Sequence, residues 1–150
     1  AMDLMLDTNI VLDHIGRREP FYELSRRTCL LGIVGEARTF VTTSMVTDLF
    51  YLLRKDFGSV EAQRMIQEDL GFLEMVSVTP DDVAEALAQR WTDFEDCLVA
   101  RCAQKVGADY IITRNVDDYK RSTVRAVTPQ QLFDELDARG IVYREIPLPV

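Results

Sequence analysis

The chain alternates between short apolar runs and longer segments in which apolar residues recur every three to four positions. The short runs, several of them rich in β-branched residues, are typical of buried strands, and the longer segments are typical of amphipathic helices. The predicted strands are residues 4–6, 39–43, 72–78, 109–113 and 124–127. The predicted helices are residues 10–15, 21–34, 45–56, 59–70, 80–90, 91–106 and 128–136.

Helices separate nearly all of the predicted strands. Strands connected in this way cannot form hairpins, so they require right-handed crossovers and pair mostly in parallel. We therefore expect an α/β fold of three layers (α/β/α), with a mostly parallel sheet of about five strands. The length of 150 residues and the hydrophobic content of 47% fit a single domain over residues 1–150. Residues 137–150, with Pro147 and Pro149, are expected to form a C-terminal extension that wraps the domain or reaches a partner.

The composition narrows the class of protein. No apolar run approaches the roughly 18 residues of a membrane span, and the N-terminus lacks the zones of a signal peptide. We expect a cytoplasmic protein without a membrane partner. Because the net charge is −8, a nucleic acid would need local basic patches, a metal or a charge-compensating partner. With His14 as the single histidine and three cysteines that lack metal-ligand spacing, any catalysis would depend on carboxylates.

Acidic residues stand at positions that a parallel sheet brings to one edge. Asp7 ends the first strand, Asp48 lies near the start of the helix after the second, and Asp118 lies just past the fourth. Asp93 and Asp96 lie three residues apart at the start of the helix that leads into the fourth strand, so they share one helix face at the same edge. For Asp7 taken alone, capping of the next helix is an equal alternative to a functional role.

Clustered carboxylates raise one another's pKa, and a divalent cation removes this conflict. Mg²⁺ and Mn²⁺ take oxygen ligands, and such an ion can activate water for attack on a phosphodiester. The acids therefore predict metal-dependent phosphodiester hydrolysis. Asp81 and Asp82 have a simpler explanation, because they follow Thr79 and Pro80 in a typical helix start, and we interpret both as structural.

Three segments of the sequence resemble the PIN domain family. They are residues 6–13, 93–100 and 108–119, and their order and spacing match the family up to about residue 136. The resemblance is closest to prokaryotic PIN proteins, many of which are VapC-like toxins of toxin–antitoxin pairs. It implies an endoribonuclease that depends on Mg²⁺ or Mn²⁺, cuts single-stranded RNA and has an antitoxin as partner. Homodimers are common among similar proteins, and the candidate dimer contacts here are Phe50, Tyr51 and Phe57.

The resemblance also implies roles for individual residues. Asp7, Asp96 and Asp118 are expected to be metal ligands, and Asp48 stands where the family usually has a catalytic Glu. Asp13 is interpreted as an acid on the helix surface. The residues expected to position water or substrate, or to support the ligands, are Thr8, Asn9, Ser44, Asp93, Thr113, Asn115 and Asp117.

Basic and aromatic residues near the predicted cleft are candidates for RNA contact. Arg114, Lys120, Arg121 and Arg125 are expected to bind phosphates, with a solvated loop as the alternative. Trp91 and Tyr119 are candidates for stacking on a base, although core packing is the favoured interpretation of both.

Two departures from the family pattern keep a second function open. Asp48 is one methylene shorter than the usual Glu, and Asn115 stands directly after the Thr-Arg pair, where the family often has an acid. The alternative is therefore a catalytically weak or inactive PIN-fold module for binding or assembly. A haloacid-dehalogenase-like phosphatase is disfavoured, because Asn9 occupies the position of its second aspartate.

Overall fold

A five-stranded parallel sheet forms the centre of the computed structural model, which describes residues 2–141. The strands are β1 (Met2–Leu6), β2 (Ala37–Thr42), β3 (Glu74–Val76), β4 (Tyr110–Ile112) and β5 (Ala126–Val127). All neighbouring strands pair in parallel, in the order β3-β2-β1-β4-β5. The predicted α/β class is confirmed, and the sheet is wholly parallel within the described residues.

The strand order reverses at β1. The chain adds β2 and β3 on one side of β1 and then returns to add β4 and β5 on the other side. The register pairs Leu6 at the end of β1 with Ile112 at the end of β4. In open α/β sheets, the crevice outside the carboxyl ends of the strands at such a switch point is the usual ligand site. Asp7, directly after β1, stands at this point.

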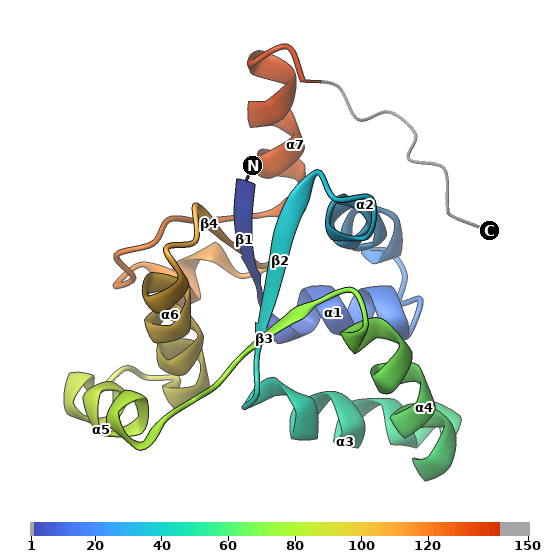
Figure 1. Ribbon diagram of the computed structural model, residues 1–150, viewed down its shortest axis with the longest axis horizontal. Coiled ribbons are helices and arrows are strands. Elements are labelled where there is room, and N and C mark those ends of the chain that lie inside the picture. The colour runs from blue at the N-terminus through green and yellow to red at the C-terminus, as the bar shows by residue number, and fades with distance from the viewer. Residues whose placement is uncertain (1, 142–150) are drawn as a thin grey trace.

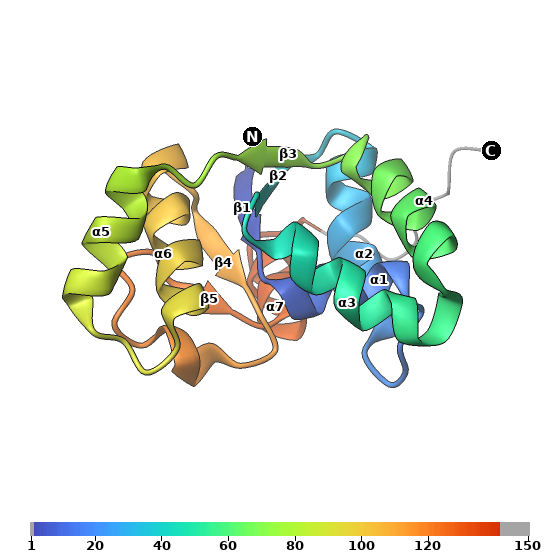
Figure 2. The same cartoon turned by 90° about the horizontal axis from the view of Figure 1, so that it is seen from below.

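Helices cover both faces of the sheet. They are α1 (Thr8–Ile15), α2 (Tyr22–Ile33), α3 (Met45–Phe57), α4 (Ser59–Leu70), α5 (Pro80–Gln89), α6 (Phe94–Val106) and α7 (Pro129–Ala138), with a 3₁₀ helix η1 (Val116–Tyr119). Figure 1 and Figure 2 show α5 and α6 on one side of the sheet and α1 to α4 on the other. Right-handed crossovers that run in opposite directions from β1 produce this arrangement, so the predicted three layers are confirmed.

Side-chain caps determine where two helices at the carboxyl edge begin. α1 begins at Thr8, two residues before the predicted start, because the Asp7 carboxylate accepts a hydrogen bond from the Thr8 N–H at 2.8 Å. α6 begins at Phe94 instead of residue 91, because Asp93 accepts a hydrogen bond from the Asp96 N–H at 2.9 Å. Two of the candidate site residues thus also hold first turns in place.

Other element boundaries follow from local chemistry. Thr79 and Thr128 form capping boxes, with Pro80 and Pro129 in the first turn, so both helix starts are as predicted. The third strand is shorter than the predicted 72–78, because β3 is an edge strand that pairs only with β2. The expected C-terminal extension begins inside α7, which runs to Ala138, and residues 142–150 lie outside the described part of the chain.

The core is built on the central strands. Leu4, Met5 and Leu6 of β1 are fully buried, as are Ile111 and Ile112 of β4. The three cysteines are free and buried, as expected of small hydrophobic side chains. None of the helices in residues 2–141 has the length and hydrophobicity that crossing a membrane requires.

Candidate active site

A cleft of about 510 Å³ opens where β1 and β4 end. Six acidic residues line it, contributed by the end of β1, the first turns of α3 and α6 with the α6 cap, and η1: Asp7, Asp48, Asp93, Glu95, Asp96 and Asp118. The other lining residues are Thr8, Asn9, Leu12, Tyr51, Leu52, Arg114 and Asn115. The structure thus brings the five acids expected at this edge to one cleft, while their chemical roles stay predictions.

Hydrogen bonds hold both carboxylate oxygens of Asp7. Oδ1 accepts from the Thr8 N–H at 2.8 Å, and Oδ2 accepts from the Thr113 hydroxyl at 2.8 Å and the Asn9 side-chain amide at 3.3 Å. Burial raises the pKa of Asp7, the bonds from Thr113 and Thr8 lower it, and the charge of Asp118 raises it; the net pKa is above its ordinary value. Asp7 is therefore both a helix cap and an acid of the cleft, so the two alternatives are not exclusive.

The Tyr119 hydroxyl interacts with two carboxylates, Asp7 and Asp96. It donates to Asp96 Oδ1 at 3.2 Å and also interacts with Asp7. Burial, together with the charges of Asp7, Asp93 and Asp118, raises the pKa of Asp96 to about 7 despite the bond from Tyr119. Burial also raises the pKa of Tyr119, which is only 2% exposed, so its hydroxyl remains a donor. Core packing of Tyr119 is confirmed, and its ring is not accessible to a base.

Glu95 lines the cleft although it was not singled out from the sequence. It accepts a hydrogen bond from the Thr8 hydroxyl at 3.2 Å. Burial, a hydrogen bond with Asp48 and the charge of Asp48 raise the pKa of Glu95 well above its ordinary value. Its position between Asp93 and Asp96 could have pointed to it, because consecutive residues in the first turn of a helix all lie around the end of that helix.

Asp13 is not on the helix surface, so that prediction was wrong. Its carboxylate is fully buried and pairs with the guanidinium of Arg114, with 3.0 Å between Oδ2 and Nε. Arg114 also lies over the Phe21 ring, 4.0 Å from its centroid. The charge that compensates Asp13 comes from a residue 101 positions away, which the local pattern cannot reveal. Among the described residues that line the cleft, Arg114 is the only cation, and this pair engages it.

Several of the predicted site residues do not line the cleft. The Ser44 hydroxyl lies 2.7 Å from the hydroxyl of Thr42 and is absent from the cleft lining. Asp117, Lys120 and Arg121 line a neighbouring hollow instead, and Arg125 lines neither of the two and pairs with Glu135. Ser44 also occupies the cap position of α3, but its side chain forms no capping hydrogen bond there.

The donor set of the cleft fits a hydrated divalent metal. The raised pKa values of Asp96 and Glu95 reflect burial and crowded negative charge, and a cation would relieve the crowding. Within residues 2–141, no three acidic, cysteine or histidine side chains converge closely enough to enclose an ion directly. Mg²⁺ keeps several waters and binds through one or two carboxylates, so the spacing of these acids is compatible with it.

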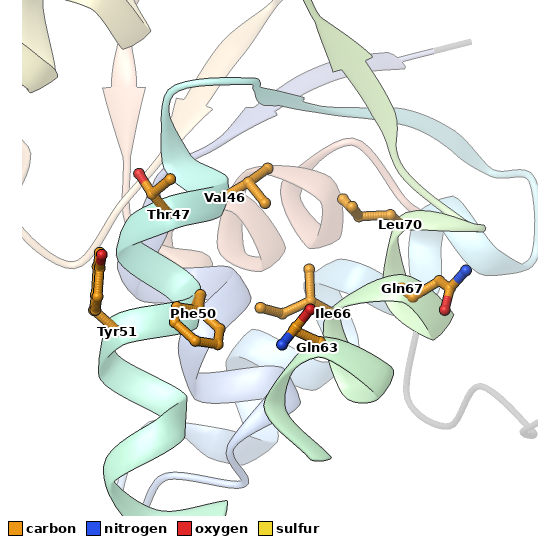
Figure 3. Close-up of a pocket in the computed structure, with 8 residues that line it drawn as sticks. All are labelled: Val46, Thr47, Phe50, Tyr51, Gln63, Ile66, Gln67 and Leu70. Carbon is orange, nitrogen blue, oxygen red and sulfur yellow. The ribbon is translucent and has the colours of Figure 1, made fainter. Parts of the chain in front are cut away.

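A second hollow, the α3–α4 groove, has a volume of about 560 Å³. Figure 3 shows Val46 and Phe50 of α3 on one side of this groove and Ile66 and Leu70 of α4 on the other. None of its eight lining residues is charged, so it lacks the groups for acid–base or metal chemistry. Tyr51 lines both the groove and the acidic cleft, which makes the two hollows neighbours.

The fold and the acidic cleft define a parallel α/β domain with a carboxylate site at its switch point. The sequence matches the family model of the PIN domain over residues 3–117. This match covers more than half of the chain, and the protein belongs to the PIN domain family. No curated protein matches the sequence.

Solved structures share this fold. A chain of VapBC2 from Rickettsia felis bound to promoter DNA matches with a TM-score of 0.62 and 20% identity, over 85% of this chain and 98% of that one. A chain of a toxin–antitoxin complex from Klebsiella pneumoniae matches with a TM-score of 0.59 and 20% identity, over 84% of this chain and 97% of that one. The sarcin-ricin loop cleaving toxin VapC20 from Mycobacterium tuberculosis matches with a TM-score of 0.59 and 15% identity, over 72% of this chain and 86% of that one. At these identities, the similarity shows a common fold.

Proposed function

We propose that this protein is a metal-dependent endoribonuclease that hydrolyses phosphodiester bonds of single-stranded RNA and acts as the toxin of a toxin–antitoxin pair. The observation that carries the proposal is the cluster of six acids at the switch point, where the lining cation Arg114 is already paired with Asp13. Such carboxylates favour a divalent cation. Membership of the PIN family and the fold shared with the RNA-cleaving toxin VapC20 support RNA as the substrate.

Asp7, Asp96 and Asp118 are the residues that would hold Mg²⁺ or Mn²⁺, one or two of them directly and the rest through water bound to the ion. When bound, the ion supplies an activated water for attack on the phosphodiester and stabilises charge on the leaving oxygen. The chain orients the ligands beforehand, because the Thr113 hydroxyl fixes Asp7 and the Tyr119 hydroxyl fixes Asp96. This second set of contacts limits the rotation of both carboxylates.

Glu95 and Asp48 both line the cleft and share a hydrogen bond. Burial, the hydrogen bond with Asp48 and the charge of Asp48 raise the pKa of Glu95, which favours a proton shared between the two carboxyls. A group with a pKa near the working pH can give or accept a proton during hydrolysis. In this proposal the pair takes the place of the single longer Glu that the family usually has, and it answers the objection that Asp48 is too short.

The toxin role requires a partner that closes the cleft. The α3–α4 groove provides an apolar surface that meets the acidic cleft at Tyr51. An antitoxin segment that carries apolar side chains followed by a basic residue would complement both surfaces. The fold shared with a chain of the Klebsiella pneumoniae toxin–antitoxin complex supports a partner of this kind.

Cleavage of labelled single-stranded RNA in the presence of Mn²⁺ tests the proposed activity. We expect the wild-type protein to cut, and we expect Asp7→Asn and Asp96→Asn each to slow cutting by at least about 100-fold, because each removes a ligand charge. Asp81→Asn is the matched control, since Asp81 is exposed in the first turn of α5, outside the cleft. EDTA should stop cleavage and added Mn²⁺ should restore it.

If the protein is instead a binding module, we expect neither RNA cleavage nor metal binding. Intact RNA at high protein and metal concentration, together with no metal binding by calorimetry, would contradict the nuclease proposal. That result would point to Asp48 and Asn115, the two departures from the family pattern, as the reason.

A further inference from the structure

A hollow of about 390 Å³ adjoins the acidic cleft and shares two of its residues, Asp93 and Asp118. We call it the Trp91 pocket. The residues that matter for its chemistry are Trp91, Asp93, Asp117, Asp118, Lys120 and Arg121. It therefore combines an aromatic wall and two cations with acids that it shares with the acidic cleft.

The aromatic wall of the pocket is rigidly supported. Trp91 is half-buried, and its indole packs edge-on against Tyr119 with 6.4 Å between ring centroids. Its Nε1–H donates to the Gln89 side-chain oxygen at 3.0 Å. Tyr119 in turn bonds to Asp96, so the same side chain supports the pocket wall and a proposed metal ligand. An aromatic side chain held in this way is a preformed surface for a base.

The two cations on the wall are available to an anion. Neither Lys120 nor Arg121 forms an ion pair with any residue in the described part of the chain, and both are exposed. Arg121 is nevertheless positioned, because its Nη2 donates to the Gln89 carbonyl oxygen at 2.9 Å and its guanidinium lies 5.8 Å from the Trp91 ring centroid. A guanidinium fixed beside an aromatic ring is suited to bind a phosphate while a base contacts the ring.

We propose that the Trp91 pocket binds the RNA nucleotide next to the scissile phosphodiester, with its base against Trp91 and its phosphate at Lys120 and Arg121. The inference rests on the proposed RNA-cleaving function, because that function identifies the ligand as RNA. Asp93, Asp117 and Asp118 line the same pocket and repel phosphate, so we expect that group to lie at Lys120 and Arg121. The chain is acidic overall, with a net charge of −8, and RNA binding then requires local cations such as Lys120 and Arg121, which lie in this pocket together with Trp91.

Trp91 is the only tryptophan of the chain, so its fluorescence reports on this pocket alone. The experiment titrates the protein in EDTA with 5′-AMP and with a single-stranded RNA tetranucleotide, and follows the indole emission. We expect saturable quenching by both probes, and affinity for the tetranucleotide about tenfold weaker in Lys120→Ala and in Arg121→Ala. Arg125→Ala is the matched control, because Arg125 is paired with Glu135 and does not line the pocket; its affinity should match the wild type.

The outcomes separate the pocket from the nuclease. Saturable quenching that depends on Lys120 and Arg121, without RNA cleavage in Mn²⁺, would support the pocket while contradicting the proposed activity. Cleavage without quenching, with KM unchanged in Trp91→Leu, would overturn the pocket and leave the nuclease standing. If cleavage and quenching both occur, Trp91→Leu should raise KM while the metal response of the protein stays that of the wild type. Wild-type affinity for the tetranucleotide in the Lys120→Ala/Arg121→Ala double variant would also contradict the proposed phosphate contacts.

Discussion

Arg114, the one cation among the described residues that line the acidic cleft, forms an ion pair with the buried Asp13. Asp13 is fully buried, and burial raises its pKa although the charges of Arg114 and Arg18 lower it. A buried carboxylate depends strongly on the cation that forms an ion pair with it, because removing that cation leaves a poorly compensated charge in the interior. Arg114 is therefore committed to the structure in addition to any contact with RNA.

Replacing Arg114 with Met tests this structural role. We expect Arg114→Met to lower the free energy of unfolding by about 3 kcal/mol, because Asp13 loses its partner inside the protein. Arg125→Met is the control, since the Arg125 side chain is 63% exposed and its ion pair with Glu135 should contribute less than about 1 kcal/mol. Urea unfolding at neutral pH measures both. Equal stabilities of the two variants would show that Arg114 serves only the cleft.

At the level of single residues, the sequence predicted where the acids lie better than it predicted which residues they contact. Asp7, Asp48, Asp96 and Asp118 were placed at the right edge, because strand ends and helix starts can be found from local patterns. Asp13 was misplaced because its partner is distant in sequence. Ser44 was expected near the substrate, but its hydroxyl turns to Thr42, a choice that depends on packing around β2.

Helix α6, which carries Asp96, is linked to α5 by ion pairs of the buried Asp82 carboxylate. Asp82 completes the capping box with Thr79 and also contacts two cations of α6, the Arg101 guanidinium at 3.0 Å and the Lys105 ammonium at 2.6 Å. Burial alone would raise the pKa of Asp82, but the bonds from Lys105, Thr79 and Arg101 outweigh it and hold the pKa well below its ordinary value. The structural role predicted for Asp82 is confirmed, and it links the two helices behind the cleft.

This lowered pKa predicts an acid-sensitive contribution to stability. A carboxylate with a lower pKa in the folded than in the unfolded state stabilises the fold above the unfolded value of about 4, and the contribution is lost as the pH falls below it. We expect Asp82→Asn to cost about 2 kcal/mol at pH 7 and to flatten the fall in unfolding free energy between about pH 4 and pH 2. Asp81→Asn, in the same turn but exposed, should retain the wild-type slope. Parallel curves for all three proteins would contradict this role.

At the level of elements, the strongest local signals were the most reliable. The Thr-Pro starts of α5 and α7 appeared where predicted, because capping boxes are local in sequence. The starts of α1 and α6 were set by Asp7 and Asp93, acids that serve as caps while facing the cleft. The predicted 72–78 strand shortened to β3, since an edge strand forms a ladder only as far as its single neighbour β2 extends.

In the whole molecule, topology explains why the acids meet. The regular alternation of strands and helices was sufficient to predict a parallel sheet, and the reversal of strand order at β1 creates the crevice beside Asp7. The contacts inside the crevice were not predictable from spacing, because they depend on which side chains of separate elements come within a few ångströms. The hydrogen bond between Glu95 and Asp48 and the Tyr119 hydroxyl between two acids are of this kind.

If the crowded cleft binds a divalent cation, as proposed, the stability of the whole domain should depend on that ion. For a single site, an ion at 100 times its Kd stabilises the folded state by about 2.7 kcal/mol. For a domain of this size, that corresponds to a rise in Tm of roughly 5–10 °C. We therefore expect Mn²⁺ to raise the Tm of the metal-free wild type in a thermal scan at pH 8, and EDTA to reverse the rise. An unchanged Tm in saturating Mn²⁺ would show that the acids tolerate one another without an ion.

Asp96→Asn should separate charge repulsion from metal binding in the same scan. The pKa of Asp96 is raised to about 7, so its ionised form opposes folding, and the stability it contributes declines as the pH rises toward that value. Without metal at pH 8, we expect Asp96→Asn to melt at a higher temperature than the wild type, because one ionised carboxylate has left the cleft. With Mn²⁺ the order should reverse, since the variant has lost a ligand and the wild type gains stability from the ion. Asp81→Asn should keep the wild-type response, because it leaves all six cleft acids in place. A variant that melts below the wild type in both conditions would mean that Asp96 stabilises the fold through its hydrogen bonds and that crowding in the cleft is weak.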